Sequence, residues 1–128
     1  MRLLLDTHVL LWALIEPAKL GPDIHALLEN PEHGILFSAA SVWEMAIRVA
    51  LGRGDFGVPP ETIVEAALAS GFIELPVRSA AALKVASLPH DHRDPFDQLL
   101  VAQAMTEPPA LHTSDAQLEA YSGLVVLV

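Results

Sequence analysis

Four acidic residues in this chain lie next to or within apolar segments, where charged side chains that serve only solubility are not expected. Two of them, Asp6 and Asp115, follow short apolar runs, and the other two, Glu44 and Asp97, fall within apolar helical patterns. Neighbouring carboxylates repel one another unless a cation is shared between them. Oxygen-only ligands suit Mg²⁺ or Mn²⁺, which meet substrate phosphates. The chemistry that this pattern favours is metal-assisted attack of water on a phosphodiester.

The first acid requires a strand to position it. Residues 3–5 are all leucine, which suits a strand buried on both faces, and Asp6 stands at its carboxyl end. Ligands of open α/β sheets bind at that edge, so the position favours a functional role. The alternative is that Asp6 or Thr7 caps the helix that follows.

A long helix must position the second acid. We expect it from residue 39 to residue 51, where Gly52 ends it, with Ala40, Glu44, Ile47 and Leu51 along its apolar stripe. A carboxylate on such a face is costly unless it is paired or binds a metal ion. The alternative to a functional Glu44 is an ion pair with Arg48 four residues later, or a side chain that reaches solvent.

The third acid belongs to a helix whose start can be read from its sequence. Asp94 has the pattern of an N-cap and Pro95 that of the first helical residue. The spacing places Asp97 on the stripe formed by Leu100, Val101 and Ala104. Because a helix N-terminus favours an ionised carboxylate, capping and function are compatible at Asp97.

The fourth acid repeats the arrangement of the first. Asp115 follows an expected strand at residues 110–112, after Thr113 and Ser114. Ser114 and Gln117 also have the spacing of a capping box, so capping competes with function here as well.

Strands alternate with helices along the whole chain. This alternation predicts a three-layer α/β/α fold with a mainly parallel central sheet, in a single domain over residues 1–128. We expect strands at residues 3–5, 34–38, 72–75, 110–112 and 124–128. Beside the helices already described, we expect a helix from Val9, a short helix ending near Asn30, and helices at residues 61–70 and 79–88.

Composition limits the classes of function. A net charge of -9 from 16 acids and 7 bases opposes diffuse binding to a phosphate backbone, so any nucleic-acid role must be local and metal-assisted. The apolar share of 52% suggests apolar surface left for a dimer or another partner.

Several other sites are absent from the sequence. There is no cysteine, which excludes thiolate chemistry and is compatible with the cytoplasm. The six histidines lack zinc-site spacing, and no serine elbow, Walker loop or dinucleotide glycine motif occurs. No apolar run near the N-terminus is long enough to span a membrane.

Taken in order, four stretches resemble the PIN-domain ribonucleases, and specifically the VapC-type toxins of bacterial toxin-antitoxin pairs. The stretches are residues 4–12, LLDTHVLLW; 38–44, SAASVWE; 92–104, HRDPFDQLLVAQA; and 113–115, TSD. The resemblance implies a PIN-like fold and endonucleolytic cleavage of RNA. It also implies that Asp6, Glu44, Asp97 and Asp115 hold one or two Mg²⁺ or Mn²⁺ ions, and that the chain forms a homodimer with a co-encoded antitoxin. Asp94 resembles an accessory residue of this branch.

Two other functions remain open from the sequence. The run ending in Asp6 also resembles the nucleophile strand of haloacid-dehalogenase-like phosphatases, although those need a second aspartate where this chain has His8. A chain with this fold could also be a non-catalytic interaction module, and the presence of all four acids argues against that.

Overall fold

A central sheet organises the molecule. The computed structural model describes residues 2–53, 57–88, 94–107, 110–113 and 125–127. The strands are β1 (Arg2–Leu5), β2 (Gly34–Ser38), β3 (Ile73–Leu75), β4 (Ala110–Thr113) and β5 (Val125–Leu127). They pair in the order β3-β2-β1-β4-β5, and each neighbouring pair is parallel. β1 is therefore the middle strand, and its residues Leu3, Leu4 and Leu5 are fully buried, as expected of a strand covered on both faces.

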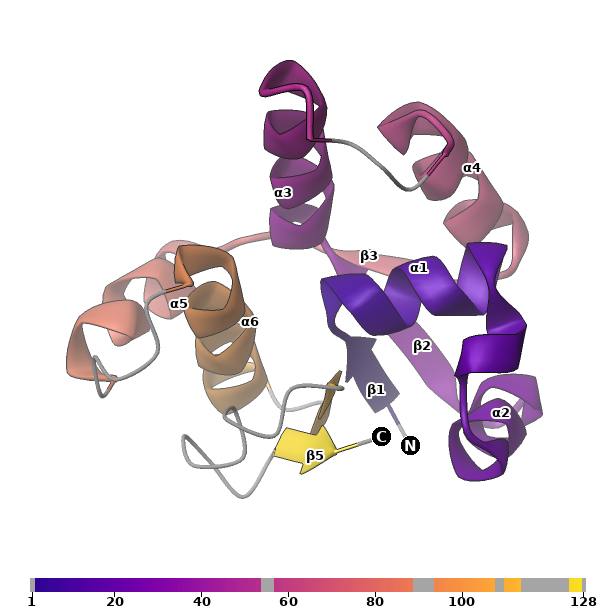
Figure 1. The fold of residues 1–128 in the computed structure, drawn as a ribbon. Helices are drawn as coiled ribbons and strands as arrows, with labels where there is room; N and C mark the ends of the chain where they lie inside the picture. The colour runs from indigo at the N-terminus through magenta and orange to yellow at the C-terminus, as the bar shows by residue number, and fades with distance from the viewer. Residues whose placement is uncertain (1, 54–56, 89–93, 108–109, 114–124, 128) are drawn as a thin grey trace.

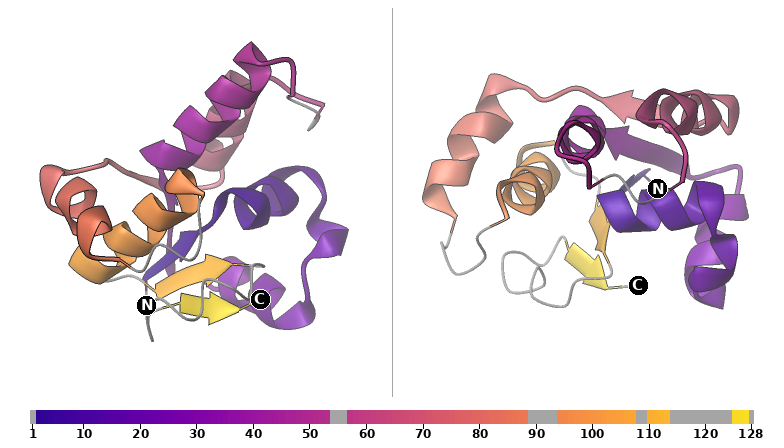
Figure 2. Two further views of the ribbon diagram at one scale, coloured as in Figure 1. Left: turned by 60° about the vertical axis from the view of Figure 1, so that its left-hand side comes forward. Right: turned by 45° about the horizontal axis from the view of Figure 1, so that its top comes forward.

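Helices cover both faces of this sheet (Figure 1). They are α1 (Thr7–Ile15), α2 (Pro22–Glu29), α3 (Ala39–Ala50), α4 (Pro60–Ala69), α5 (Ser79–Lys84) and α6 (Pro95–Thr106), with 3₁₀ turns η1 (Pro17–Lys19) and η2 (Val85–Ser87). Figure 2 shows α5 and α6 on one side of the sheet, with α1 and α4 on the other. The three-layer α/β/α architecture predicted from the sequence is confirmed.

Alternating leucines of β1 divide the core into two layers. Leu4 packs with Leu36 of β2 and Leu100 of α6 in one layer. Leu3 and Leu5 pack in the other layer, with residues of α1 to α4. Each of these leucines is fully buried. Burying a leucine side chain stabilises the fold by about 1.5–3 kcal/mol, so β1 anchors both layers.

Strand register aligns the ends of the central strands. Leu5 pairs with Phe37 of β2 and with His112 of β4. Asp6 and Ser38, the next residues, therefore both start their helices from the same edge of the sheet. β4 runs parallel to β1 and ends at Thr113 beside this edge.

The apolar stripe expected along α3 holds only for its first half. Ala40 and Glu44 are buried, but Leu51 is 62% exposed, contrary to the prediction. The reason is that α3 extends beyond the sheet edge (Figure 1), so its last turn has no layer to pack on. Gly52, with φ +72°, follows that turn, as expected.

Candidate active site

Asp6 caps the first helix and is buried. Its carboxylate accepts a hydrogen bond of 2.8 Å from the backbone N–H of Val9, and the residue is only 3% exposed. The capping alternative raised by the sequence is therefore correct in structure. Capping does not argue against a functional role for Asp6. A serine could cap the helix equally well, without the free-energy cost of burying a carboxylate at the carboxyl edge of a parallel sheet.

Thr7 connects this position to the second acid. Its Oγ1 lies 2.8 Å from Oε1 of Glu44, to which the hydroxyl donates, and 2.9 Å from Oγ of Ser41. A threonine hydroxyl has one proton, so its bond to the carboxylate leaves Ser41 to donate toward Thr7. The start of α1 is thereby fastened to the middle of α3, and Asp6 and Glu44 belong to one buried polar cluster.

Glu44 has both carboxylate oxygens engaged. Oε1 accepts from Thr7, and Oε2 lies 2.7 Å from a terminal nitrogen of Arg48. Glu44 is 3% exposed, whereas the Arg48 side chain is 37% exposed. The ion pair raised as an alternative for Glu44 is therefore present. It also places a cation on a buried carboxylate, which indicates that this oxygen attracts positive charge.

The third acid lies in the first turn of α6. Asp94 caps this helix: its carboxylate accepts from the backbone N–H of Phe96 at 2.9 Å and of Asp97 at 3.3 Å. Asp97 is half-buried in the first turn, while Leu100 and Val101 beyond it are fully buried. The start of α6 and the inward stripe are thus as the sequence predicts.

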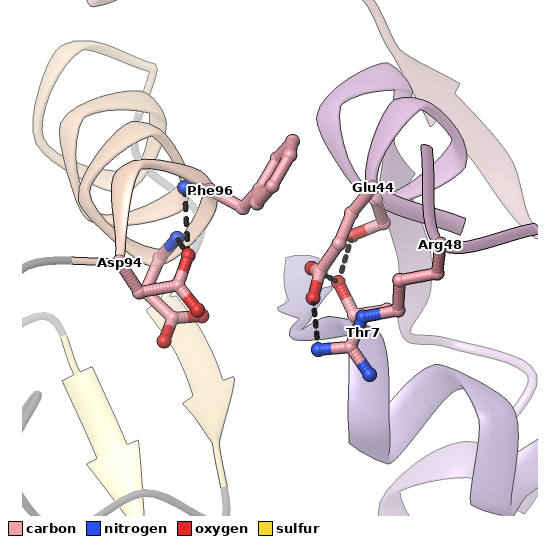
Figure 3. Close-up of polar contacts among 7 residues, drawn as sticks. Thr7, Glu44, Arg48, Asp94 and Phe96 are labelled. Atoms are coloured by element: carbon pink, nitrogen blue, oxygen red, sulfur yellow. Dashed lines mark hydrogen bonds and ion pairs between the residues drawn. The ribbon is translucent and has the colours of Figure 1, made fainter. Parts of the chain in front are cut away.

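A hollow separates the two helices that carry these acids. It has a volume of about 420 Å³ and is lined by Glu44 and Arg48 from α3 and by Asp94 and Phe96 from the start of α6, among others. Figure 3 shows Asp94 and Phe96 facing Glu44 and Arg48 across it, with Thr7 beneath Glu44. Glu44 lines this hollow although it is only 3% exposed, so a ligand in the hollow would reach its carboxylate beside Arg48.

Two contacts fix α6 against α3. Near the sheet, Ser38 donates to the side-chain oxygen of Gln103 at 2.5 Å. Farther out, the rings of Trp43 and Phe96 meet edge to face, with centroids 5.0 Å apart. The start of α3 thus lies beside the end of α6, so the two helices are antiparallel. This arrangement brings the first turn of α6 level with Glu44.

The comparison with known families decides what kind of domain this is. Residues 3–124 match the model of the PIN domain. The chain belongs to the PIN-domain family. PIN domains are nucleases and generally use divalent metal ions, so membership assigns the chain to the hydrolases. The match leaves no support for the phosphatase alternative.

One solved structure resembles this fold over nearly its whole length. The crystal structure of VapBC2 from Rickettsia felis, bound to a DNA fragment from its promoter, superimposes with a TM-score of 0.69 at 15% sequence identity. The match covers 100% of this chain and 98% of the other. At this identity the likeness concerns the fold. The sequence has no match among the curated proteins.

The described acids of this PIN domain do not form a complete metal site. Within residues 2–53, 57–88 and 94–107, no three acidic or histidine side chains lie close enough together to hold an ion. The structure connects Asp6 and Glu44 through Thr7 and places Asp94 across the hollow from Glu44. Asp115 lies outside the described residues. Asp6 and Glu44 nevertheless have the chemistry that a hard cation such as Mg²⁺ requires. Both offer buried carboxylate oxygens, and one oxygen of Glu44 already binds the Arg48 guanidinium.

In the sequence analysis Thr7 was only a possible helix cap, and no role was assigned to Ser38, Ser41 or Gln103. Their hydrogen bonds join residues 34 to 65 positions apart. The available signal was that Ser38 and Gln103 interrupt otherwise apolar segments, and both are fully buried or nearly so. Among the residues that the structure describes, no helix is long and apolar enough to cross a membrane.

Ser38→Ala is expected to destabilise this PIN domain by about 1–3 kcal/mol. The change removes the N-cap bond to Ala40 and leaves the buried oxygen of Gln103 without its donor. Urea unfolding should give a lower midpoint at an unchanged slope. Ser87→Ala is the matched control, because that hydroxyl is exposed and bonds only to the carbonyl of Lys84. Equal losses in both variants would contradict the structural role of Ser38.

Proposed function

We propose that this chain is a metal-dependent endoribonuclease and the toxin of a bacterial toxin-antitoxin pair, acting on RNA in the cytoplasm as a single domain. The observation that carries the proposal is the buried cluster of Asp6, Thr7 and Glu44 at the carboxyl edge of a PIN-domain sheet. Its similarity in fold to a VapBC2 structure supports the toxin assignment.

The proposed metal ligands are Asp6, Glu44, Asp97 and Asp115, with Mg²⁺ or Mn²⁺ as the ion. Asp6 and Glu44 supply buried oxygens, and Asp97 stands in the first turn of α6, directly after Asp94, Pro95 and Phe96, which line the hollow. Asp115 is included because β4, which it follows by two residues, runs parallel to β1 toward the same edge. Asp94 is assigned a capping role.

A bound Mg²⁺ or Mn²⁺ would activate water for attack on phosphorus and stabilise charge on the phosphate oxygens. The chain's own residues hold the geometry for this. Thr7 fixes one oxygen of Glu44 by its hydrogen bond, and the backbone of α1 fixes Asp6. Arg48 must release or share the other oxygen of Glu44, and its guanidinium then lies beside the hollow, where it can contact a phosphate.

The runner-up function is a non-catalytic interaction module. Its strongest support is that Glu44 is already neutralised by Arg48. The nuclease is favoured because a purely structural pair would not need a second acid, Asp6, buried at the same edge.

The test of substrate class compares two oligonucleotides of the same sequence. The purified chain with Mg²⁺ is expected to cut single-stranded RNA internally and to leave DNA intact. Because water is the proposed nucleophile, the products should carry no 2′,3′-cyclic phosphate. Cyclic ends would indicate attack by the ribose 2′-hydroxyl, and cleavage of neither strand would favour the interaction module.

We further propose two protein partners, a second copy of this chain and an antitoxin. Large apolar side chains remain exposed, including Trp43 at 56% and Leu83 at 75%. Such side chains mark contact surfaces when they gather in patches. Light scattering of the purified chain measures the dimer, and co-expression with the neighbouring reading frame tests the antitoxin.

An antitoxin segment is expected to inhibit by placing an Arg or Lys among the acids. The ion pair of Glu44 with Arg48 supports this, because the same carboxylate accepts a guanidinium within this chain. Inhibition should weaken as the metal concentration rises, since cation and side chain compete for the same oxygens. The antitoxin would instead act by blocking the RNA path if inhibition persisted at all metal concentrations and after replacement of its basic residues.

A further inference from the structure

A second hollow lies on the outer side of α1. Its volume is about 280 Å³, and its walls come from α1, the 3₁₀ turn after it and one residue of α3. Leu11 and Ile15 supply apolar surface, while His8, Trp12, Lys19 and Arg48 supply rings and positive charge. Pockets for drug-sized ligands span about 300–1,000 Å³, so this hollow suits something smaller, such as one nucleobase.

Two rings and a cation meet in this hollow. His8 and Trp12 are one helical turn apart, with ring centroids 6.2 Å apart and planes inclined by 52°. The Lys19 ammonium lies 6.0 Å from the centroid of the Trp12 ring and 3.2 Å from the Glu16 carboxylate. His8 is exposed and Trp12 is half-buried, so each presents part of its ring to solvent.

Arg48 links this hollow to the buried acid Glu44. His8 follows Asp6 and Thr7 in the first turn of α1. Arg48 lines this hollow as well as the one between α3 and α6, and it donates to Glu44. A strand that crosses the acids would therefore pass over Arg48 and continue to Trp12.

Basic side chains are more frequent along this path than in the chain as a whole. The chain has only 7 basic residues against 16 acids. Three of them, Lys19, Arg48 and Arg53, line these two hollows, where three acids, Glu16, Glu44 and Asp94, balance them. In a protein of net charge -9, a lining with balanced charge repels a polyanion less than the remainder of the chain does.

We infer that the hollow on α1 is a binding subsite for one nucleotide of single-stranded RNA flanking the cleaved phosphodiester. Its base stacks on Trp12 beside His8, and its phosphate lies between Lys19 and Arg48. Aromatic side chains combined with basic groups are the usual platform for single strands, and stacking tolerates any base. The inference rests on the proposed ribonuclease function and assigns to it a place for the substrate.

The test measures binding of a labelled single-stranded RNA hexamer in EDTA, so that binding is observed without metal-dependent cleavage. Trp12→Leu is expected to weaken binding about fivefold to a hundredfold, the effect of losing one stacked base. Trp12→Phe keeps a ring and should recover most of the affinity. Thermal melts of both variants separate this effect from the part of Trp12 that packs on the core.

Charge and fluorescence provide independent readouts. Lys19→Ala should reduce the salt dependence of binding by about 0.7 in slope, as expected for one phosphate contact on a single strand. Lys84→Ala, on α5 across the sheet, should leave the slope unchanged. Because the chain has two tryptophans, Trp43→Phe leaves Trp12 as the sole indole, and its fluorescence should be quenched by the hexamer.

The outcomes separate a failure of the proposed nucleotide subsite from a failure of the proposed ribonuclease function. If the wild-type chain cuts RNA but Trp12→Leu binds the hexamer as tightly and Trp12 fluorescence is unchanged, the subsite is wrong and the ribonuclease assignment stands. If Trp12→Leu loses only stability, its role is structural and the subsite is likewise wrong. A wild-type chain that neither binds nor cuts RNA overturns both.

Discussion

Asp6→Asn is expected to abolish RNA cleavage while the protein stays folded. Asparagine is as good an N-cap as aspartate, so its side-chain oxygen can still accept from the N–H of Val9, and α1 should begin where it does now. The substitution removes the negative charge that a divalent ion requires. Mutation of groups that only support metal ligands costs about 10- to 100-fold in activity, so loss of a ligand should exceed that range.

Turnover and thermal unfolding of Asp6→Asn should be measured on the same preparation. We expect a melting temperature close to that of the wild type and no cleavage above background. Full nuclease activity in this variant would mean that Asp6 is only a cap, and the site assignment would be wrong.

The second large effect is a separation between two acids of the same helix start. Asp97→Ala is expected to lose cleavage activity, because Asp97 is the proposed ligand. Asp94→Ala should instead lose about 0.5–2 kcal/mol of stability, because its carboxylate accepts from two backbone N–H groups at the start of α6. Unfolding in urea and turnover with Mg²⁺ measure the two effects.

Asp94→Asn is the control for this pair, since it keeps the cap and removes the charge. It should resemble the wild type in both measurements. Asp94 lines the hollow opposite Glu44, so the alternative is a real one. Equal loss of activity in Asp94→Asn and Asp97→Ala at unchanged stability would make Asp94 a ligand as well.

The fold could be predicted because its signals are local. An all-leucine run identifies a strand buried on both faces, and residues 34–38 and the Asp94-Pro95 pair mark a strand and a helix start where the structure has them. The sheet order was not predicted, because side-chain patterns indicate which faces are buried and not which strands are neighbours. Leu51 was misplaced for a related reason: periodicity does not reveal where a helix leaves the sheet.

The site could be predicted only in part. The sequence identified Asp6, Glu44 and Asp97 as inward or edge-facing acids, and it raised the Glu44 pair with Arg48 because four residues form one helical turn. It could not reveal that Thr7 spans 37 positions to reach Glu44. Contacts of that kind depend on how α1 and α3 pack, which no local pattern encodes. Asp115 stays a prediction, outside the described residues.

The central claim is that the buried acids bind a divalent ion with which the chain cuts RNA. The most direct test titrates Mg²⁺ and Mn²⁺ into EDTA-treated protein and follows cleavage of single-stranded RNA, with Glu44→Gln in parallel. We predict no cleavage in EDTA, saturable recovery with either ion in the wild type, and no recovery in Glu44→Gln. Cleavage in EDTA at the rate seen with Mg²⁺, or full recovery by Glu44→Gln, would contradict the claim.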